Sequence, residues 1–142
     1  MTTRRGRCLC GAVTFSADIA SNNVNACHCG MCRQWTTGPM MTVEHQGPVT
    51  FTGADNIGRY HASATGERGF CKTCGSSLFW KLKDQDHYWL SAGTLEDPSG
   101  FKLAEELFFD VKPAFYALAG DSKKLTSADY AALVAGADGG ND

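Results

Sequence analysis

The sequence predicts an all-β fold of short antiparallel strands, with metal-binding cysteine knuckles and one short helix near the C-terminus. Segments rich in β-forming residues are only a few residues long and are separated by turn-forming residues. Many short strands with frequent turns are typical of a mainly antiparallel β domain. All seven cysteines lie in three close-spaced groups, which favours metal binding within such a domain.

Length and charge limit the possible classes of protein. The 142 residues match the size of one domain, which we expect to span residues 1–135, with residues 136–142 as a disordered tail. The formal net charge is -2 and the charges are interspersed, so there is no electrostatic basis for binding nucleic acid. No apolar run is long enough for a signal peptide or a membrane span. We therefore expect a cytoplasmic protein that is mature from Met1; no oligomeric state follows from the sequence.

Strands are expected where β-forming residues alternate or cluster between turns. Val13 and Phe15 alternate directly after the first cysteine group, where Gly11 allows a tight turn. Later turns are indicated by Gly-Pro, Gly-Ala-Asp, Thr-Gly and Asp-Pro-Ser-Gly sequences. Between these turns the sequence predicts further strands at residues 40–44, 49–52, 57–61, 77–82, 88–91, 106–111 and 115–118.

Two short helices are expected. The first spans residues 30–35, within the second cysteine group. The second spans residues 127–134, where Thr126 or Ser127 can cap the N-terminus. Asp129 lies in the first turn of this helix, where the helix dipole favours negative charge. No internal repeat or low-complexity linker interrupts the chain.

The cysteine count favours metal binding over disulfide formation. Seven is an odd number, so the cysteines cannot all pair, and two cysteines separated by one residue rarely bridge each other well. In a reducing cytosol, close-spaced cysteines are more often metal ligands or redox groups. A thioredoxin-like redox motif would be expected beside a βαβ pattern, which this sequence lacks. We therefore interpret the cysteine groups as ligands for two zinc ions.

Four cysteines are predicted to form a closed, structural zinc site. Cys71-Lys-Thr-Cys74 has the spacing of a knuckle that turns both sulfurs to one side, and a glycine follows it. Cys8-Leu-Cys10, also followed by glycine, offers the same turn chemistry. Together the two pairs supply four thiolates, enough for a tetrahedral shell, and such a zinc contributes about 10 kcal/mol or more to folding. We call these cysteines the four-cysteine site.

The remaining cysteines are predicted to form an open, catalytic zinc site. Cys27-His28-Cys29-Gly-Met-Cys32 places three thiolates on one turn and leaves a coordination position for water or substrate. We call these cysteines the three-cysteine site. We expect His28 to be a supporting or surface group, because neighbouring residues in an extended segment point to opposite faces. His61 could supply a fourth ligand, although a half-exposed strand residue is the simpler interpretation. A second structural zinc, completed by a distant group, is the alternative for the whole site.

Four motifs also carry a resemblance to a known family. They are Cys8-Leu-Cys10-Gly-Ala-Val, Cys27-His-Cys29-Gly-Met-Cys32-Arg, Arg68-Gly-Phe70-Cys71-Lys-Thr-Cys74-Gly-Ser and Ala92-Gly93-Thr94-Leu95-Glu-Asp97-Pro98. With them the sequence resembles the glutathione-dependent formaldehyde-activating enzyme (GFA) family, also called the CENP-V/GFA domain, over most of its length. The resemblance implies an Mss4-like or β-tent fold, a structural zinc at the four-cysteine site and a second zinc at the three-cysteine site. It also implies a carbon–sulfur lyase that interconverts S-hydroxymethylglutathione with formaldehyde and glutathione.

The sequence departs from the family pattern towards its C-terminal end. Many relatives have a His-Ile-Phe-Val-like segment where this chain reads Glu106-Leu-Phe-Phe, so Glu106 replaces the family histidine. Relatives also have a Lys-x-x-Trp-Tyr-like segment where this chain reads Lys112-Pro-Ala-Phe-Tyr116. The chain is short for the glutathione-specific prototype. If the family histidine shapes the pocket, the substrate here differs from that of the relatives.

The leading functional expectation is a zinc-dependent carbon–sulfur lyase that acts on small thiol–aldehyde adducts such as S-hydroxymethylglutathione. The three-cysteine site would hold the catalytic zinc, and the partner would be a small thiol or its adduct. Basic residues near the cysteine groups could bind an anionic substrate: Arg33, Arg59, Arg68 and Lys72. The alternative is a non-catalytic zinc-binding module with two structural sites that binds a protein. A third possibility is a zinc store or redox sensor that loses its ion on oxidation.

Overall fold

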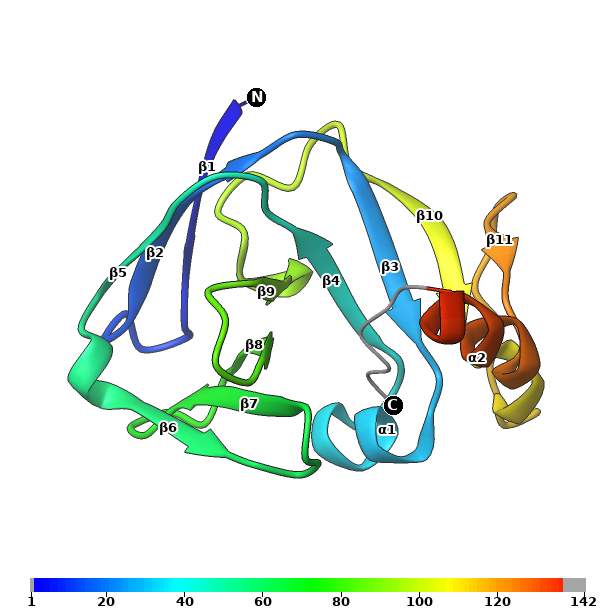
Figure 1. Cartoon of the computed structure of the whole chain (residues 1–142). Coiled ribbons are helices and arrows are strands. Elements are labelled where there is room, and N and C mark those ends of the chain that lie inside the picture. Colours follow the sequence, from blue (N-terminus) through cyan, green and yellow to red (C-terminus); the bar gives the residue numbers. More distant parts are fainter. Residues whose placement is uncertain (1, 137–142) are drawn as a thin grey trace. The chain divides into compact units, whose positions relative to one another are not determined.

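The computed structural model describes residues 2–136, and most of the expected tail, residues 137–142, lies outside the described residues. Within them the fold is mostly β, as predicted, with eleven strands and two short α-helices (Figure 1). The chain forms two compact units. Of the described residues, the first unit contains 2–22 and 42–101, and the second contains 23–41 and 102–136. The expectation of a single domain over residues 1–135 stays a prediction.

The first unit contains a three-stranded antiparallel sheet. Its strands are β1 (Thr2–Arg7), β2 (Thr14–Ile19) and β5 (Val49–Thr52), with β2 in the centre (Figure 1). Thr14 pairs with Arg7 on one side and with Thr52 on the other. The alternating burial along β2 places Phe15, Ala17 and Ile19 in the core, as the alternation of apolar residues predicts.

A second antiparallel set of strands lies in the first unit, apart from Met40 and Met41 at the start of β4, which belong to the second unit. It runs in the order β4, β9, β8, β7, β6, so that consecutive strands from β6 to β9 are neighbours. The bounds are β4 (Met40–Glu44), β6 (Ile57–Tyr60), β7 (Gly66–Cys71), β8 (Ser77–Leu82) and β9 (Tyr88–Ser91). The pairing of β4 with β9 uses Thr42 to Glu44. Short 3-10 helices lie at Ala54–Asn56, before β6, and at Ala92–Thr94, after β9.

Aromatic side chains join the strands of the first unit in its core. The ring of Phe51 lies 6.0 Å from that of Phe15 and 5.6 Å from that of Phe79, measured between centroids. Tyr88 packs edge-on against Phe79 at 4.9 Å. Phe79 and Leu90 are completely buried. This packing of large apolar side chains fixes the strands that carry the four-cysteine site.

The second unit is built on parallel strand pairs. Its strand order is β11, β10, β3, with β10 (Lys102–Leu107) parallel to both β3 (Asn23–Cys27) and β11 (Lys123–Lys124). Helix α1 (Gly30–Thr36) follows β3, and helix α2 (Ser127–Gly136) follows β11 (Figure 1). No helix of the described chain is long and apolar enough to cross a membrane.

Arg4 connects the two points at which the chain leaves the first unit. Its Nη2 donates a hydrogen bond to Asn22 Oδ1 at 3.5 Å. Its guanidinium carbon lies 4.8 Å from the centroid of the Phe101 ring, over the ring face. Asn22 and Phe101 are the last residues of the first unit before β3 and β10, respectively. Arg4 therefore holds the starts of these two strands together.

Most predicted elements are present, and four strands have the predicted bounds: β4, β5, β8 and β9. The strand predicted at residues 57–61 ends at Tyr60, and the predicted helices extend to Thr36 and Gly136. At the second helix, Thr126 Oγ1 accepts a hydrogen bond from the Asp129 N–H at 3.0 Å, so Thr126 is the cap.

Two predicted strands were wrong in whole or in part. The strand predicted at residues 106–111 begins earlier, at Lys102, and ends at Leu107, because Phe108 has a φ of 56° and breaks the extended backbone. A 3-10 helix, Phe109–Val111, follows. Residues 115–118 form no strand, since the side-chain amine of Lys112, and no neighbouring strand, binds the carbonyl oxygen of Tyr116 as it binds that of Pro113.

Candidate metal centres

The seven cysteines form two clusters, and each cluster lies within one unit. In the first unit, the sulfur atoms of Cys8, Cys10, Cys71 and Cys74 all lie within 4.8 Å of one another. In the second unit, the sulfur atoms of the three-cysteine site do the same. The structure thus brings together the residues that were assigned to each site from their spacing. Both clusters have a donor set that suits zinc, because thiolates are soft ligands that this ion prefers.

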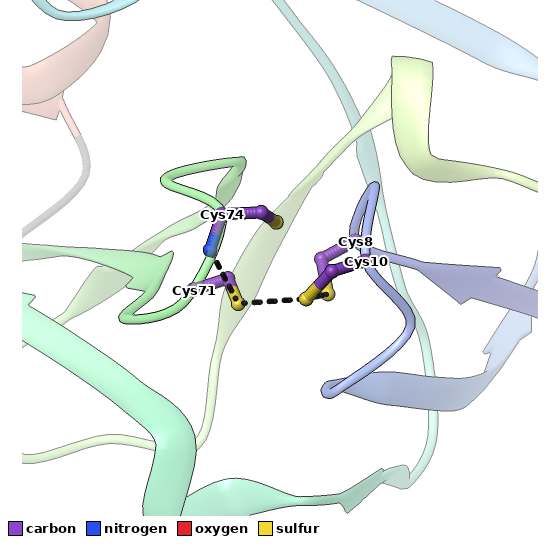
Figure 2. Close-up of side chains that lie close together, drawn as sticks. All are labelled: Cys8, Cys10, Cys71 and Cys74. Carbon is purple, nitrogen blue, oxygen red and sulfur yellow. Dashed lines mark hydrogen bonds between the residues drawn. The ribbon is translucent and has the colours of Figure 1, made fainter.

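The four-cysteine site is made by two similar turns. Figure 2 shows Cys8 and Cys10 on one loop and Cys71 and Cys74 on another, with sulfurs facing each other. In the first turn the N–H of Gly11 donates to the carbonyl of Cys8 at 3.2 Å, and in the second the N–H of Gly75 donates to that of Cys71 at 2.8 Å. Both glycines have positive φ, 81° and 79°, which other residues adopt only with strain.

Backbone and side-chain N–H groups point at the buried sulfurs of this site. The Val13 N–H lies 3.3 Å from Cys8 Sγ, and the Cys74 N–H lies 3.4 Å from Cys71 Sγ. Asn56 Nδ2 adds a third contact, 3.3 Å from Cys71 Sγ. Such donors stabilise the negative charge of a thiolate. Asn56 could not be recognised from the sequence, because it lies far from the cysteine motifs along the chain.

Ser76 connects the two turns. Its hydroxyl oxygen accepts a hydrogen bond from the Leu9 N–H at 3.0 Å and lies 3.2 Å from Cys74 Sγ. The hydrogen bond from this hydroxyl is the largest reason why the pKa of Cys74 is lowered to about 5. The pKa of Cys71 is also lowered, chiefly by the Cys74 N–H. Lowered thiol pKa values favour the thiolate form, which binds metal.

The three-cysteine site lies where β3 ends and α1 begins. Cys27 is the last residue of β3 and is paired with Leu107 of β10. Cys29 is the N-cap of α1, and its sulfur accepts a hydrogen bond from the Cys32 N–H at 3.5 Å. Two of the three candidate ligands are therefore fixed by a strand end and a helix cap. Met31, between them and Cys32, is exposed.

Within this site one thiol differs sharply from its neighbours. The pKa of Cys29 is lowered, first by hydrogen bonds from the thiols of Cys27 and Cys32 and then by backbone N–H groups. The pKa of Cys27 is raised, because its proton is shared with the neighbouring sulfurs and its own charge is disfavoured by burial. Cys27 and Cys29 are half-buried. In residues 2–136 no fourth His, Cys, Asp or Glu ligand atom joins the cluster.

His28 joins the three-cysteine motif to Glu106 of β10 and to Tyr116 through its two ring nitrogens. Its Nε2 lies 2.8 Å from Glu106 Oε1, and its Nδ1 lies 2.8 Å from the Tyr116 hydroxyl. His28 and Glu106 are both completely buried. Glu106 Oε2 accepts a hydrogen bond from Ser122 Oγ and lies 3.6 Å from Lys124 Nζ. The residue that replaces the family histidine thus contacts the cysteine motif through His28.

Arg33 and Tyr116 both contact His28, which lies between two of these cysteines in the sequence. Arg33 Nε donates a hydrogen bond to the His28 carbonyl at 2.9 Å. The pKa of Tyr116 is raised, mainly by burial, with contributions from the charges of Cys27 and Glu106 that the charge of Arg33 opposes. Arg33 is one of the candidate anion-binding residues predicted from the sequence. No role for Tyr116 could be predicted, because its contact with His28 depends on the tertiary fold.

The other candidates are engaged in the first unit. His61 Nε2 lies 2.9 Å from Glu67 Oε2, so it is not part of either cysteine cluster. Arg59 donates to the same carboxylate at 2.6 Å. Arg68 is only 4% exposed. The side-chain amine of Lys72 binds the carbonyl oxygen of Asp55 at 3.1 Å.

A sequence profile described as "Glutathione-dependent formaldehyde-activating enzyme" matches residues 3–111, which include all seven cysteines. The chain belongs to this family. A Schizosaccharomyces pombe protein described as an uncharacterized lyase is 28% identical over 127 residues, which cover 89% of this chain and 93% of the relative. A crystal structure of a Rhodobacter sphaeroides protein, a structural genomics target, superposes with a TM-score of 0.56 and 23% identity. That match covers 65% of this GFA-family chain and 87% of the other, and it concerns the fold.

Proposed function

We propose that this protein is a zinc-dependent carbon–sulfur lyase that acts on adducts of a small thiol and an aldehyde, such as S-hydroxymethylglutathione. The observation that carries this proposal is the three-cysteine site. Its sulfurs lie within 4.8 Å of one another, and no fourth His, Cys, Asp or Glu ligand joins them among residues 2–136. Three protein ligands with one position left for substrate are typical of catalytic zinc. Membership of the GFA family and the lyase description of the yeast relative support the same reaction class.

The proposed reaction needs no oxidant or reductant. In an adduct R–S–CH2–OH, the carbon–sulfur bond breaks and its electron pair stays on sulfur. The hydroxyl oxygen forms a second bond to carbon and loses its proton, and sulfur takes up a proton, so the products are a thiol and formaldehyde. The reverse reaction forms the same bond. Zinc bound at the three-cysteine site supplies a Lewis acid and an open coordination position for this chemistry.

The chain itself contributes position and charge. The end of β3 and the N-cap of α1 fix Cys27 and Cys29, which are the proposed ligands together with Cys32. Arg33 is half-buried, and its bond to the His28 carbonyl holds the guanidinium beside the cluster. A fixed guanidinium binds carboxylates well, which suits an anionic thiol such as glutathione. We infer a reducing, cytoplasmic setting, because close-spaced thiols persist there.

The four-cysteine site is proposed as the structural zinc site. Its ligands join the loop after β1 to the end of β7, so a bound ion crosslinks distant parts of the first unit. Four thiolates leave no open position for a substrate. Two zinc ions per chain are therefore proposed, with different roles.

Substitution of one cysteine in each site tests the division of roles. Cys29→Ser should give a folded protein with one zinc less and without lyase activity, because only the open site is changed. Cys74→Ser should give little folded protein, since a structural zinc contributes about 10 kcal/mol or more. The measurements are circular dichroism, zinc content and the rate of S-hydroxymethylglutathione cleavage. If both variants lost their folded structure to the same extent, the assignment of one catalytic and one structural site would be wrong.

Cobalt substitution separates the lyase from a non-catalytic protein-binding module. In the lyase, addition of glutathione to the cobalt form should change the visible spectrum of the open site, because a thiolate enters the coordination shell. In a module with two closed sites the spectrum should stay the same. Cys29→Ser is the control, since its remaining cobalt site should not respond to glutathione.

A further inference from the structure

The ring nitrogens and the backbone of His28 are all held by other residues of the second unit. Its Nε2 lies 2.8 Å from Glu106 Oε1, and its Nδ1 lies 2.8 Å from the Tyr116 hydroxyl. Its N–H donates to the carbonyl of Leu107 at 3.0 Å, and its own carbonyl accepts a hydrogen bond from Arg33 Nε at 2.9 Å. Since His28 is the residue between two of the three candidate ligands, these contacts fix the backbone that joins them.

Glu106 of β10 is in turn held by residues at β11, the strand next to it (Figure 1). Its Oε2 accepts a hydrogen bond from Ser122 Oγ and lies 3.6 Å from Lys124 Nζ. Lys124 Nζ also lies 3.2 Å from Ser122 Oγ, so the two side chains hold Glu106 together. The Glu106 side chain is only 1% exposed. A buried carboxyl group that loses such partners is left unsatisfied or has to move.

These two partners of Glu106 lie beyond residues 3–111, the part of the chain that the family profile matches. His28 and Glu106 lie within it. The support of the three-cysteine motif therefore includes a segment that the family match does not cover. Neither Ser122 nor Lys124 belongs to the cysteine cluster. We expect them to affect a bound metal through Glu106, the group that both contact.

We propose that Ser122 and Lys124 are positioning residues of the three-cysteine site. By binding Glu106 they hold His28, and with it the backbone between two metal ligands, in place. This inference rests on the metal site of the proposed function and assigns a role in it to the segment after residue 111. Residues that orient metal ligands from outside the coordination shell typically change metal affinity by about 10- to 100-fold when they are substituted.

The rate at which a mild chelator removes the first zinc ion from the zinc-loaded protein tests the inference. Ser122→Ala should increase this rate about tenfold, because Glu106 loses its hydroxyl partner. Lys124→Met keeps the apolar stem and should increase it about threefold, since an ion pair with a partly exposed lysine contributes less. Lys123→Met is the matched control and should match the wild type, because Lys123 is exposed and neighbouring strand residues point to opposite faces.

A double variant shows whether Lys124 acts through Glu106. Glu106→Gln keeps the shape of the side chain and replaces the acidic group that Lys124 faces by an amide. In this background Lys124→Met should change the rate of zinc loss by less than about twofold, because residues that act through one contact are not additive. An undiminished effect of Lys124→Met in the double variant would overturn the inference.

Hydrogen exchange separates positioning from a general loss of stability. In zinc-loaded Ser122→Ala the amides of His28 and Arg33, which donate to backbone carbonyls at the cysteine motif, should exchange faster. Residues 42–101 of the first unit should exchange as in the wild type. Faster exchange confined to residues 120–136 would show that β11 is loosened without an effect on His28, and equal acceleration in both units would show general destabilisation. Either result would contradict the positioning role.

The outcomes separate this inference from the proposed function. If the wild type binds two zinc ions and loses the first no more slowly than Ser122→Ala and Lys124→Met do, the positioning role is wrong and the lyase function stands. If the wild type binds only one zinc, the proposed function is wrong. Exchange at His28 then decides the inference alone: faster exchange in Ser122→Ala supports it, and unchanged exchange overturns it. Lys124→Met alters a partly exposed side chain, so it gives the answer if Ser122→Ala fails to fold.

Discussion

Asn56 shows how a single side chain can tune a cysteine ligand without being one. Its Nδ2 lies 3.3 Å from Cys71 Sγ and 2.9 Å from Thr73 Oγ1. The amide therefore donates to a sulfur that carries negative charge when it binds metal. Residues that support metal ligands in this way typically change metal affinity by about 10- to 100-fold when they are substituted.

Asn56→Asp should weaken zinc binding at the four-cysteine site by about tenfold or more. The substitution keeps the shape of the side chain, removes the N–H donor and adds a negative charge beside the thiolate. Zinc affinity can be measured by competition with a chelator. Asn22→Asp is the matched control, because Asn22 is exposed and its side chain contacts Arg4, not a cysteine. Equal affinity of both variants would show that the amide does not support the site.

For single residues, the sequence identifies those whose function depends on local spacing. The cysteines could be grouped because C-x-C and C-x-x-C motifs turn their sulfurs to one side within a few residues. Glu106 could be singled out because it departs from a family motif. Tyr116 and Ser122 could not, since each contacts a group that is far away in the sequence and no local pattern records that contact.

Among the elements, β6 is attached to β7 by a small ion-pair network. Glu67 of β7 accepts hydrogen bonds from Arg59 of β6 at 2.6 Å and from His61, just after β6, at 2.9 Å. The Glu67 side chain is 10% exposed. Burial disfavours its charge, but the bonds from Arg59 and His61 outweigh this effect and lower the pKa of Glu67. The network adds side-chain bonds to the backbone ladder that joins this edge strand to β7.

Glu67→Gln should lower the free energy of unfolding by about 1 kcal/mol at pH 7, because charge-assisted hydrogen bonds are lost. A carboxyl whose folded pKa lies below its unfolded value stabilises the fold above the ordinary glutamate pKa of about 4.3 and loses this contribution as pH falls through the folded value. The difference from wild type should therefore shrink below about pH 4.

Urea unfolding of both proteins across this pH range measures the effect. Glu96→Gln is the control, since Glu96 is exposed in the first unit, and its difference from wild type should be small at every pH. A Glu67→Gln difference that stays constant from pH 7 to pH 3 would contradict the role assigned to the charge.

The elements that could be predicted are those whose residues show a local pattern. β4, β5, β8 and β9 are short apolar or alternating segments between turns, and their bounds match the structure. β1 could not be recognised, because its sequence, Thr-Thr-Arg-Arg-Gly-Arg, is polar and largely exposed. The parallel pairing of β3 with β10 was also missed. It joins residues far apart along the chain, and short-range periodicity carries no information on such contacts.

For the molecule as a whole, each compact unit carries one of the two candidate metal sites. The four-cysteine site lies entirely in the first unit and the three-cysteine site entirely in the second. Metal loss at one site should therefore disturb mainly the unit that contains it. A closed shell also releases its ion less readily than an open one.

Mild chelation of freshly reduced protein should lower the zinc content from two ions per chain to one, and the loss should come from the three-cysteine site. Hydrogen exchange should then become faster in residues 23–41 and 102–136 and stay slow in residues 42–101, because the first unit keeps its crosslink. Elemental analysis and mass spectrometry of the exchanged peptides measure both effects. A single zinc that chelation never removes would instead favour the protein-binding module.

The fold class and the family could be predicted for the whole molecule, because cysteine spacing and turn frequency are properties of the sequence itself. The mostly β architecture confirms the fold class, and the match of the family profile to residues 3–111 confirms the family. The division into two units could not be predicted. Each unit is made of two separate segments, and only long-range contacts reveal which segments belong together.

The contact of Arg4 with Asn22 and Phe101 has a consequence for the order of folding. The first residues of β3 and β10 that pair, Asn23 and Lys102, are about 80 positions apart, and closing a loop of that length in an unfolded chain costs about 4 kcal/mol of entropy. Once the first unit has folded, Arg4 already holds the two strand starts together. Most of the entropy of loop closure has then been lost before β3 and β10 pair. The second unit should therefore fold after the first, with the first unit as its nucleus.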